Sequence, residues 1–412
     1  MTSPNKVLVA SGSFKDVYTP LEACHTIQTA AQKVFPMWNI EVIPMVDGGE
    51  YSAETLAEHL GLEKIIVDDL VGPQHNATNS FYVKMASDEV YIATSSIVKL
   101  EPQYIDSANP LLYTSYGLGQ LVLNALDKGY TKINIGLGGT NTVDCGTGMM
   151  QALGAKFIGK SGELLEPSSG SYFSGGDLSS ISAIDINEID SRIQQSSFQV
   201  ICDARPSVNQ METPIRQKIG KDNHDNTIYD QLLNGIKSYA EAAKPIISVT
   251  APNNYSDDLL NAPFYGAAGG ILYSILCITD SVVRIGFKFF AEQFNLEASI
   301  NEHDMVVTGE GKLDNSLFGK TPIGISQTAK LYGKDVIFLT GHFDEWNDLT
   351  DNYIIEKIPP ELKDEGVTHL VVCNKYYQNI MLPSGYPEKI KAYKLNNRIA
   401  FEEAFKELEN TI

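Results

Sequence analysis

The sequence predicts an α/β protein with two domains, in which a second α/β domain is inserted into a doubly wound, mostly parallel sheet domain. Its length of 412 residues suits two domains of ordinary size. The first sixty residues alternate strand, loop and helix, as parallel βα units do. From residue 70 the pattern changes to polar residues alternating with aromatic or β-branched ones, which is typical of antiparallel strands. We therefore predict a first domain over 1–70 plus 286–412, an inserted domain over 71–285, and an active-site cleft between them.

The N-terminal segment predicts the opening of the first domain. The apolar run over 6–10 predicts a buried strand, and a capping box at 19–22 predicts a helix with proline in its first turn. A second strand is predicted over 39–45. Because the loops that follow parallel strands lie at the same edge of a sheet, Lys15 and Asp47 would share one crevice.

A loop rich in glycine and threonine marks the inserted domain. It follows a predicted strand over 132–137 and precedes a predicted helix over 149–153. A loop of this kind between strand and helix is a candidate oxyanion site, because its backbone N–H groups face the ligand. The candidate binding residues in this loop are Gly138, Gly139, Thr140 and Asp144.

The stretch DMVVTGEGKLDNSLFGKTPIG over 304–324 carries the densest set of functional side chains. Apolar residues over 305–307 predict a buried strand, and Thr321-Pro322 predicts the start of a helix. The loop between them suits Mg-bound phosphate, since carboxylates hold the metal and lysines hold phosphate oxygens. It is not a Walker A loop, because position 314 holds Asp where that motif needs Gly. An ordinary turn is the alternative, but glycines and charges rarely alternate so densely in one. Its charged residues are Glu310, Lys312, Asp314 and Lys320.

Composition narrows the class of protein. Hydrophobic content of 43% and charged content of 20% are those of a globular protein. The formal net charge of -20 argues against nucleic acid or an anionic membrane as partner. Five scattered cysteines without a CxxC pair indicate a reducing compartment and no structural zinc. With no apolar run of signal-peptide or membrane-span length, we expect a cytoplasmic enzyme or binding protein.

Taken together, these loops resemble the type I glycerate kinases, which phosphorylate D-glycerate from ATP. The resemblance extends from Val7 to Gly341. It rests on Ser13-Phe14-Lys15, Asp47-Gly48-Gly49-Glu50, the loop from Gly138 to Gly148, Cys202-Asp203, the run from Gly266 to Gly270, and the signature formed by 308–314 and 319–324.

The chain departs from the family pattern at several positions. Gly12 stands where the family usually has Asp, and Tyr51-Ser52 stands where it has Gly-Thr. Lys312 replaces the usual Arg. The family loop Gly-Gly-Ser-Ala-Thr-Asn-Asp-Gly-Gly is here GGTNTVDCG, so Val143 replaces Asn and Cys145 replaces Gly. Tyr91 replaces an acid in the middle domain, and Arg205 lies in another replaced segment. The replacements are heaviest in the inserted domain and bear on the substrate more than on the fold.

The resemblance implies an enzyme that uses ATP and Mg²⁺ to phosphorylate D-glycerate to phosphoglycerate, with 2-phosphoglycerate as the expected product. Two alternatives remain open at this point: a kinase of a different small hydroxy acid, or an inactive glycerate-kinase-like binding protein. The expected partners are the small acid and ATP, with no nucleic acid and no membrane. The sequence does not determine the oligomeric state.

Residue type and loop placement assign provisional roles at the positions that the resemblance supports. The catalytic candidates are Asp314, Asp47 and Lys15, and the metal ligands are Glu310 and Asp314. Substrate or phosphate would be bound by Ser13, Gly138, Gly139, Thr140, Asp144, Glu310, Lys312 and Lys320.

Overall fold

The computed structural model describes residues 4–14, 17–99, 106–168, 170–202, 205–220, 226–313, 321–343, 354–355, 358, 360–372 and 398–409. The chain divides into two compact units. The first joins Met1–Asp47 to Phe287–Ile412, and the second is Gly48–Gly286. The division after Asp47 differs from the predicted boundary after residue 70. It differs because the strand over 64–71 is hydrogen-bonded into the sheet of the second unit.

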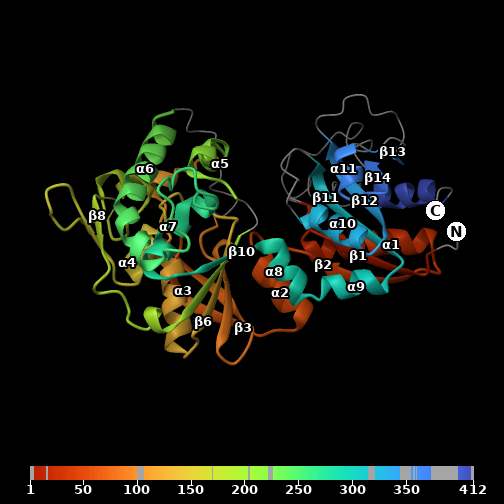
Figure 1. Ribbon diagram of the computed structural model, residues 1–412, viewed down its shortest axis with the longest axis horizontal. Coiled ribbons are helices and arrows are strands. Elements are labelled where there is room, and N and C mark those ends of the chain that lie inside the picture. The colour runs from red at the N-terminus through yellow and green to blue at the C-terminus, as the bar shows by residue number, and fades with distance from the viewer. Residues whose placement is uncertain are drawn as a thin grey trace. The chain divides into compact units, whose positions relative to one another are not determined.

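The first unit is built on a six-stranded sheet in the order β13-β14-β12-β11-β1-β2. Neighbouring strands are parallel except β13, which is antiparallel to β14, and β1 lies between β11 and β2 (Figure 1). The predicted parallel α/β arrangement is thus confirmed. Its elements are β1 (Lys6–Ser11), α1 (Pro20–Val34), β2 (Asn39–Pro44), α8 (Gly286–Gln293), α9 (Leu296–Glu302), β11 (Met305–Leu313), α10 (Thr321–Leu331), β12 (Asp335–Phe343), β13 (Ile354–Ile355), α11 (Pro360–Asp364), β14 (His369–Val372) and a helix over 398–408.

Local sequence explains how β1 and α1 form. Five of the six residues of β1 are buried, as expected of a central parallel strand covered on both faces. The predicted capping box at the start of α1 is present: the Thr19 hydroxyl accepts from the backbone N–H of Glu22. In return, the backbone N–H of Thr19 donates to the Glu22 carboxylate over 3.0 Å. These two bonds satisfy N–H groups that a helix start would otherwise leave unpaired.

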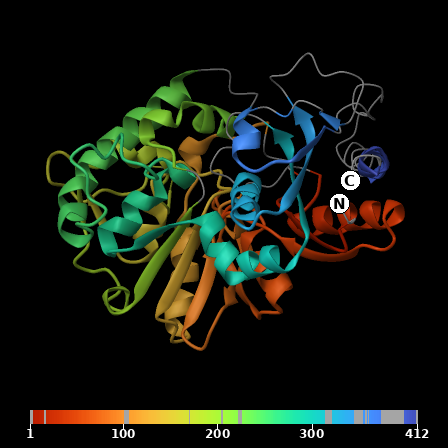
Figure 2. The same ribbon diagram turned by 45° about the vertical axis from the view of Figure 1, so that its right-hand side comes forward.

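The helix over 398–408 packs beside α1 and completes the core of the first unit (Figure 2). Phe401 meets Phe14 edge to face, with ring centroids 5.6 Å apart. Phe405 meets Trp38 in the same way at 6.3 Å. Lys33 of α1 pairs with Glu402. The last described segment is therefore an integral part of this unit.

Strand β11 is longer than the sequence indicated. We expected a strand over 305–307 followed by a loop, but β11 continues through Leu313 and stays paired with β12. Gly309 permits this close pairing, since a Cβ there would stand 2.4 Å from the carbonyl oxygen of Leu339. The Ser11 hydroxyl also donates to the Gly309 carbonyl oxygen over 3.1 Å. Glu310 and Lys312 are thus strand residues, which fixes their backbone more firmly than a loop would.

The second unit is built on a mixed six-stranded sheet in the order β10-β9-β6-β5-β4-β3. The pairs β3–β4 and β4–β5 are antiparallel, as predicted for 70–100, and the remaining pairs are parallel. Its elements are α2 (Ser52–Leu60), β3 (Lys64–Val71), β4 (Ala77–Lys84), β5 (Glu89–Ala93), α3 (Tyr116–Asp127), β6 (Lys132–Leu137), α4 (Thr147–Ala152), β7 (Lys156–Ile158), β8 (Ala183–Asp185), β9 (Ser197–Cys202), α5 (Glu212–Lys218), α6 (Asn226–Thr250), α7 (Ile271–Ile278) and β10 (Val282–Ile285).

Helices cover both faces of this sheet. Alternate residues of β5 separate the two faces: Val90 and Ile92 belong to the large core that also holds α3, α4, α6 and α7. Tyr91 points the other way and reaches α2, where its hydroxyl donates to Ser52 over 3.0 Å. Within this unit α2 therefore packs on the face opposite the large core (Figure 1). Among the described helices, none is long and apolar enough to cross a bilayer.

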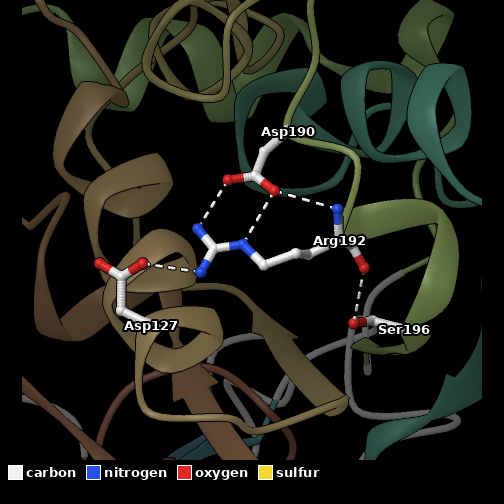
Figure 3. A network of polar contacts seen from close by, with 4 residues as sticks. All are labelled: Asp127, Asp190, Arg192 and Ser196. Atoms are coloured by element: carbon white, nitrogen blue, oxygen red, sulfur yellow. Dashed lines mark hydrogen bonds and ion pairs between the residues drawn. The ribbon is translucent and has the colours of Figure 1, made fainter.

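A polar network ties the segment before β9 to the end of α3 (Figure 3). The Arg192 guanidinium makes two bonds to Asp190, of 2.9 and 2.6 Å, and a third of 2.7 Å to Asp127. The backbone N–H of Arg192 also donates to Asp190 over 3.0 Å, and the Ser196 hydroxyl donates to the Arg192 carbonyl oxygen over 2.9 Å. A forked arginine bonded to two carboxylates fixes both segments in a defined geometry.

Candidate functional site

Two glycine pairs, Gly48-Gly49 and Gly138-Gly139, pack against each other at the carboxyl edge of β6. A Cβ on Gly138 would stand 2.6 Å from the Cα of Gly49, and one on Gly139 would stand 2.7 Å from the Glu50 side chain. Gly48 has a φ of 97° and lies against the carbonyl of Ile201 at the end of β9. Only glycine permits this approach of two backbones. The structure thus brings together two motifs that lie ninety residues apart in the sequence.

Hydroxyl groups hold these glycine pairs in place. The Thr94 hydroxyl is 2.9 and 3.0 Å from the carbonyl oxygens of Gly136 and Gly138, and it accepts from the backbone N–H of Gly138 over 3.1 Å. The hydroxyls of Ser52 and Ser95 donate to the Gly49 carbonyl oxygen over 2.7 and 3.2 Å. The two loops are therefore fixed before any ligand arrives.

An ion pair lies beside the first glycine pair. Lys99 is 2.8 Å from the Glu50 carboxylate and sits over the Tyr51 ring at 5.6 Å. Burial lowers the pKa of Lys99, but the hydrogen bond and charge of Glu50, followed by Tyr51 and Glu54, outweigh it and raise the pKa. Lys99 therefore stays protonated and supports Glu50.

Asp144 lies within the fold and not on its surface. It is fully buried, and its carboxylate accepts from the backbone N–H and hydroxyl of Ser115 over 2.8 and 2.7 Å. It also accepts from the N–H groups of Gly146 and Gly148 over 3.2 and 3.3 Å. Burial raises the pKa of Asp144, and these hydrogen bonds oppose the rise. Both carboxylate oxygens of Asp144 already accept hydrogen bonds from the protein, so this geometry favours a role in holding the loop in place.

The backbone N–H groups of the glycine-rich loop differ in availability. That of Gly138 is used by Thr94, and that of Asn141 donates to Val98 over 3.0 Å. Within the described part of the chain, the N–H groups of Gly139 and Thr140 have no hydrogen-bond partner. These two N–H groups can donate to an oxyanion, whereas that of Gly138 is already used by Thr94.

Lys218, at the end of α5, contacts the glycine-rich loop and was not among the residues predicted from the sequence. Its ammonium group donates to the Thr140 hydroxyl over 3.1 Å and to the Thr142 carbonyl oxygen over 2.9 Å. Burial lowers its pKa to about 8, although Asp144 acts in the opposite direction. Its partners lie more than seventy positions earlier in the chain, so no short stretch of sequence reveals the contact. Only the contact across the fold identifies it.

The first unit gathers polar residues at the carboxyl edge of its own sheet. Ser13 follows β1, Asp47 follows β2, and Glu310 lies within the last residues of β11. All three are half-buried. Because β1 is parallel to both neighbours, the ends of these strands lie at one edge, as predicted.

Several predicted site residues lie outside the described part of the chain. Lys15, Asp314 and Lys320 are among them, and only the backbone of Lys312 is described, in β11. No group of three or more His, Cys, Asp or Glu suited to a metal occurs among the described residues. A Mg²⁺ held by one or two carboxylates together with substrate phosphates needs no such group, so Glu310 and Asp314 still suit it chemically.

The described cysteines are core residues. Cys24, Cys145, Cys202 and Cys277 are all buried. Burial raises the pKa of the Cys24 thiol to about 12, and it raises those of Cys145 and Cys277 as well. A thiol that does not ionise near neutral pH is a poor nucleophile. None of these three therefore suits covalent catalysis.

The profile of the glycerate kinase family matches residues 7–368. The chain belongs to this family. It is 32% identical over 343 residues to a glycerate kinase of Bacillus cereus, covering 82% of this chain and 85% of that protein. It is 31% identical over 339 residues to a glycerate 2-kinase of Escherichia coli, with the same coverage. It also resembles a crystal structure of the Salmonella typhimurium protein assigned as glycerate kinase 2, with a TM-score of 0.70, 26% identity and 98% of each chain covered.

Family membership makes the chain a glycerate-kinase-like phosphotransferase whose acceptor is an alcohol group. The resemblance to the family also bears on two residues with an unusual backbone conformation. Tyr51 and Cys145 have positive φ values of 62° and 51°, and both stand where the family pattern has glycine. The chain keeps the left-handed backbone at both positions although a side chain there is strained.

Proposed function

We propose that the protein transfers a phosphoryl group from ATP to D-glycerate, with 2-phosphoglycerate as the product and Mg²⁺ as the required ion. The observation that carries the proposal is the family match over 7–368, which includes both interlocked glycine pairs and the sequence of β11. The name of the Escherichia coli relative, glycerate 2-kinase, supports transfer to the 2-hydroxyl.

The first unit would supply the charged groups for the transfer. We assign Asp314 and Asp47 as the candidates for the base that accepts the proton of the attacking hydroxyl. Lys15, Lys312 and Lys320 would offset negative charge on phosphate or on the glycerate carboxylate. Ser13 would hydrogen-bond a ligand oxygen at the same sheet edge, where it is half-buried.

Glu310 and Asp314 would hold Mg²⁺. Glu310 lies in β11 and is paired in register with Thr340 of β12, so its backbone position is fixed by the sheet. A bound Mg²⁺ would supply charge neutralisation on the phosphate oxygens. Phosphoryl transfer then needs positioning and charge stabilisation from the protein and no covalent step, which agrees with the inert cysteines.

Two departures from the family pattern do not weaken this proposal. Val143 is fully buried within the large core of the second unit. Tyr91 is also fully buried, and its hydroxyl bonds Ser52 at the start of α2. Neither side chain is exposed to contact a soluble ligand. These replacements therefore count as changes of packing, which favours an active enzyme over an inactive binding protein.

The test is release of ADP from Mg-ATP in the presence of D-glycerate, followed by identification of the phosphorylated carbon by NMR. We expect turnover that depends on glycerate and Mg²⁺ and that Asp314→Asn abolishes. Asp364→Asn, a matched change on the exposed face of α11, should leave turnover intact. Turnover only with another hydroxy acid would reassign the substrate. No turnover with any acid in a folded protein would refute the proposal.

A further inference from the structure

Lys218 is a half-buried cation with no carboxylate partner among the described residues. Its hydrogen-bond partners among the described residues are neutral: the Thr140 hydroxyl and the Thr142 carbonyl oxygen. No described carboxylate oxygen lies within 4 Å of its ammonium group. An ammonium group removed from water loses hydration that neutral partners replace only in part. The lowered pKa of Lys218 reflects this cost. An anion bound beside Lys218 would compensate it.

Donors for such an anion lie on the residue that Lys218 contacts. Thr140 presents its hydroxyl to Lys218 and has a backbone N–H group without a partner among the described residues. The preceding residue, Gly139, has a second such N–H group and is exposed. A cation in contact with a residue whose own and preceding N–H groups have no partner among the described residues matches the donor set that proteins use for carboxylates and phosphates.

The fold holds these donors in a fixed position. The loop that carries them is fixed at one end by Thr94, which bonds Gly138, and at the other by Asp144, which bonds Gly146 and Gly148. A donor set fixed before binding loses little conformational freedom when a ligand arrives. Lys218 adds a third constraint from α5, a different part of the chain.

We propose that Lys218, with the backbone N–H groups of Gly139 and Thr140, forms an oxyanion-binding site of the second unit. The proposal rests on the function proposed above and names a residue that binds its ligand. The ligand group is a carboxylate or a phosphate: the carboxylate of the acceptor acid and the phosphates of the nucleotide share this chemistry. The experiment below separates the two sources.

The test is calorimetric titration of the full-length protein with D-glycerate, ADP and inorganic phosphate in separate runs. Lys218→Gln keeps a hydrogen-bond donor for Thr140 and Thr142 but removes the charge, and Lys218→Arg keeps the charge. We expect Lys218→Gln to raise the Kd for one ligand class about tenfold to hundredfold, the effect of losing one charged hydrogen bond. Lys218→Arg should recover most of the affinity. Lys237→Gln, at an exposed position of the neighbouring helix α6, is the matched control and should bind as the wild type does.

Each outcome has a defined meaning. Weakened D-glycerate binding identifies the acceptor carboxylate as the ligand, and weakened ADP and phosphate binding identifies the nucleotide. If Lys218→Gln is folded and binds all three ligands as the wild type does, the site does not exist, even if turnover is reduced. Calorimetry measures ligand binding without turnover, so this test does not depend on the proposed activity. A wild type that binds phosphate through Lys218 but does not phosphorylate glycerate would refute the proposed function and leave this site intact.

Discussion

The carbonyl oxygen of Gly48 lies 2.7 Å from the point where a Cβ on Gly136 would stand, and the Tyr91 hydroxyl overlaps that point as well. Position 136, near the carboxyl end of the buried strand β6, therefore has no room for a side chain. The loop containing Gly48 and Gly49 lies directly on the sheet surface at this residue. The absence of a side chain at Gly136 thus lets the loop of the first glycine pair lie against β6.

Gly136→Ala should displace the loop that carries Gly48. We expect the free energy of unfolding in urea to fall by about 1–3 kcal/mol, as for other overpacked core positions. Glycerate affinity should fall with it, because the glycine pairs separate. Tyr91→Phe in the same protein removes the nearest clashing atom, the Tyr91 hydroxyl oxygen, and should recover part of the stability. An alanine variant as stable as the wild type would show that the loop does not rest on this strand.

The sequence was sufficient to predict the parts of the fold that depend on local pattern. The capping box at Thr19, the strand over 132–137 and the switch to antiparallel strands after residue 70 are all present. The length of β11 was missed because Gly309, Glu310 and Gly311 look like a loop until β12 is known to pair with them.

Contacts across the chain were not predictable in the same way. Lys218 meets Thr140 only because β6 and the end of α5 come together in the folded unit. Asp144 was predicted as a binding residue from its place in a polar loop, whereas its burial depends on Ser115 in a distant segment. Sequence pattern identifies the loops, but packing decides which of their groups remain available.

Tyr51→Gly should relieve strain at the start of α2. A φ of 62° is unfavourable for a residue with a side chain, by about 1–2 kcal/mol. The comparison with Tyr51→Ala isolates this effect, because both variants remove the ring over Lys99 but only glycine removes the Cβ. We expect the glycine variant to exceed the alanine variant by about 1 kcal/mol in urea unfolding. Equal stability would mean that the backbone relaxes at this position.

Asp144→Asn should weaken the glycine-rich loop. Its carboxylate accepts four hydrogen bonds, and an amide NH₂ in its place would face N–H donors. We expect a loss of about 1–3 kcal/mol in unfolding free energy. Ser115→Ala removes only one donor and should cost about 1 kcal/mol. If Asp144 instead contacts ligand directly, Asp144→Asn would raise the ligand Kd without lowering stability.

Arg192→Lys should lose the forked bond to Asp190 while keeping the charge. The pair is partly exposed, so we expect a loss of about 0.5–1 kcal/mol in unfolding free energy at neutral pH. The hydrogen bond from Arg192 lowers the pKa of Asp190 below its usual 3.8. A carboxyl pKa that is lower in the folded state stabilises the fold at pH values above the unfolded-state pKa. This contribution is lost as the pH falls through the folded-state pKa. The variant and the wild type should therefore converge in stability as the pH falls from 3.8 through the lowered pKa of Asp190. A constant difference across that range would assign the effect to packing.

Oxyanion binding at Lys218 should weaken as the pH rises through about 8. Burial lowers the pKa of Lys218 to about 8, so the ammonium group loses its proton well below the ordinary value of 10.5. Lys218→Arg should remove this pH step, because a guanidinium stays protonated over this range. Asp144, the charged group that acts on Lys218, is present in both proteins and cannot cause a difference between them.

The free energy of unfolding should rise with pH over the same range, whereas ligand affinity falls. Between pH 8 and 10.5 the unfolded chain binds more protons at Lys218 than the folded chain does, so the unfolding free energy of the wild type should rise relative to that of Lys218→Gln. Calorimetric Kd values and urea unfolding over this range measure both effects, and parallel curves for wild type and variants would exclude Lys218 as the titrating group.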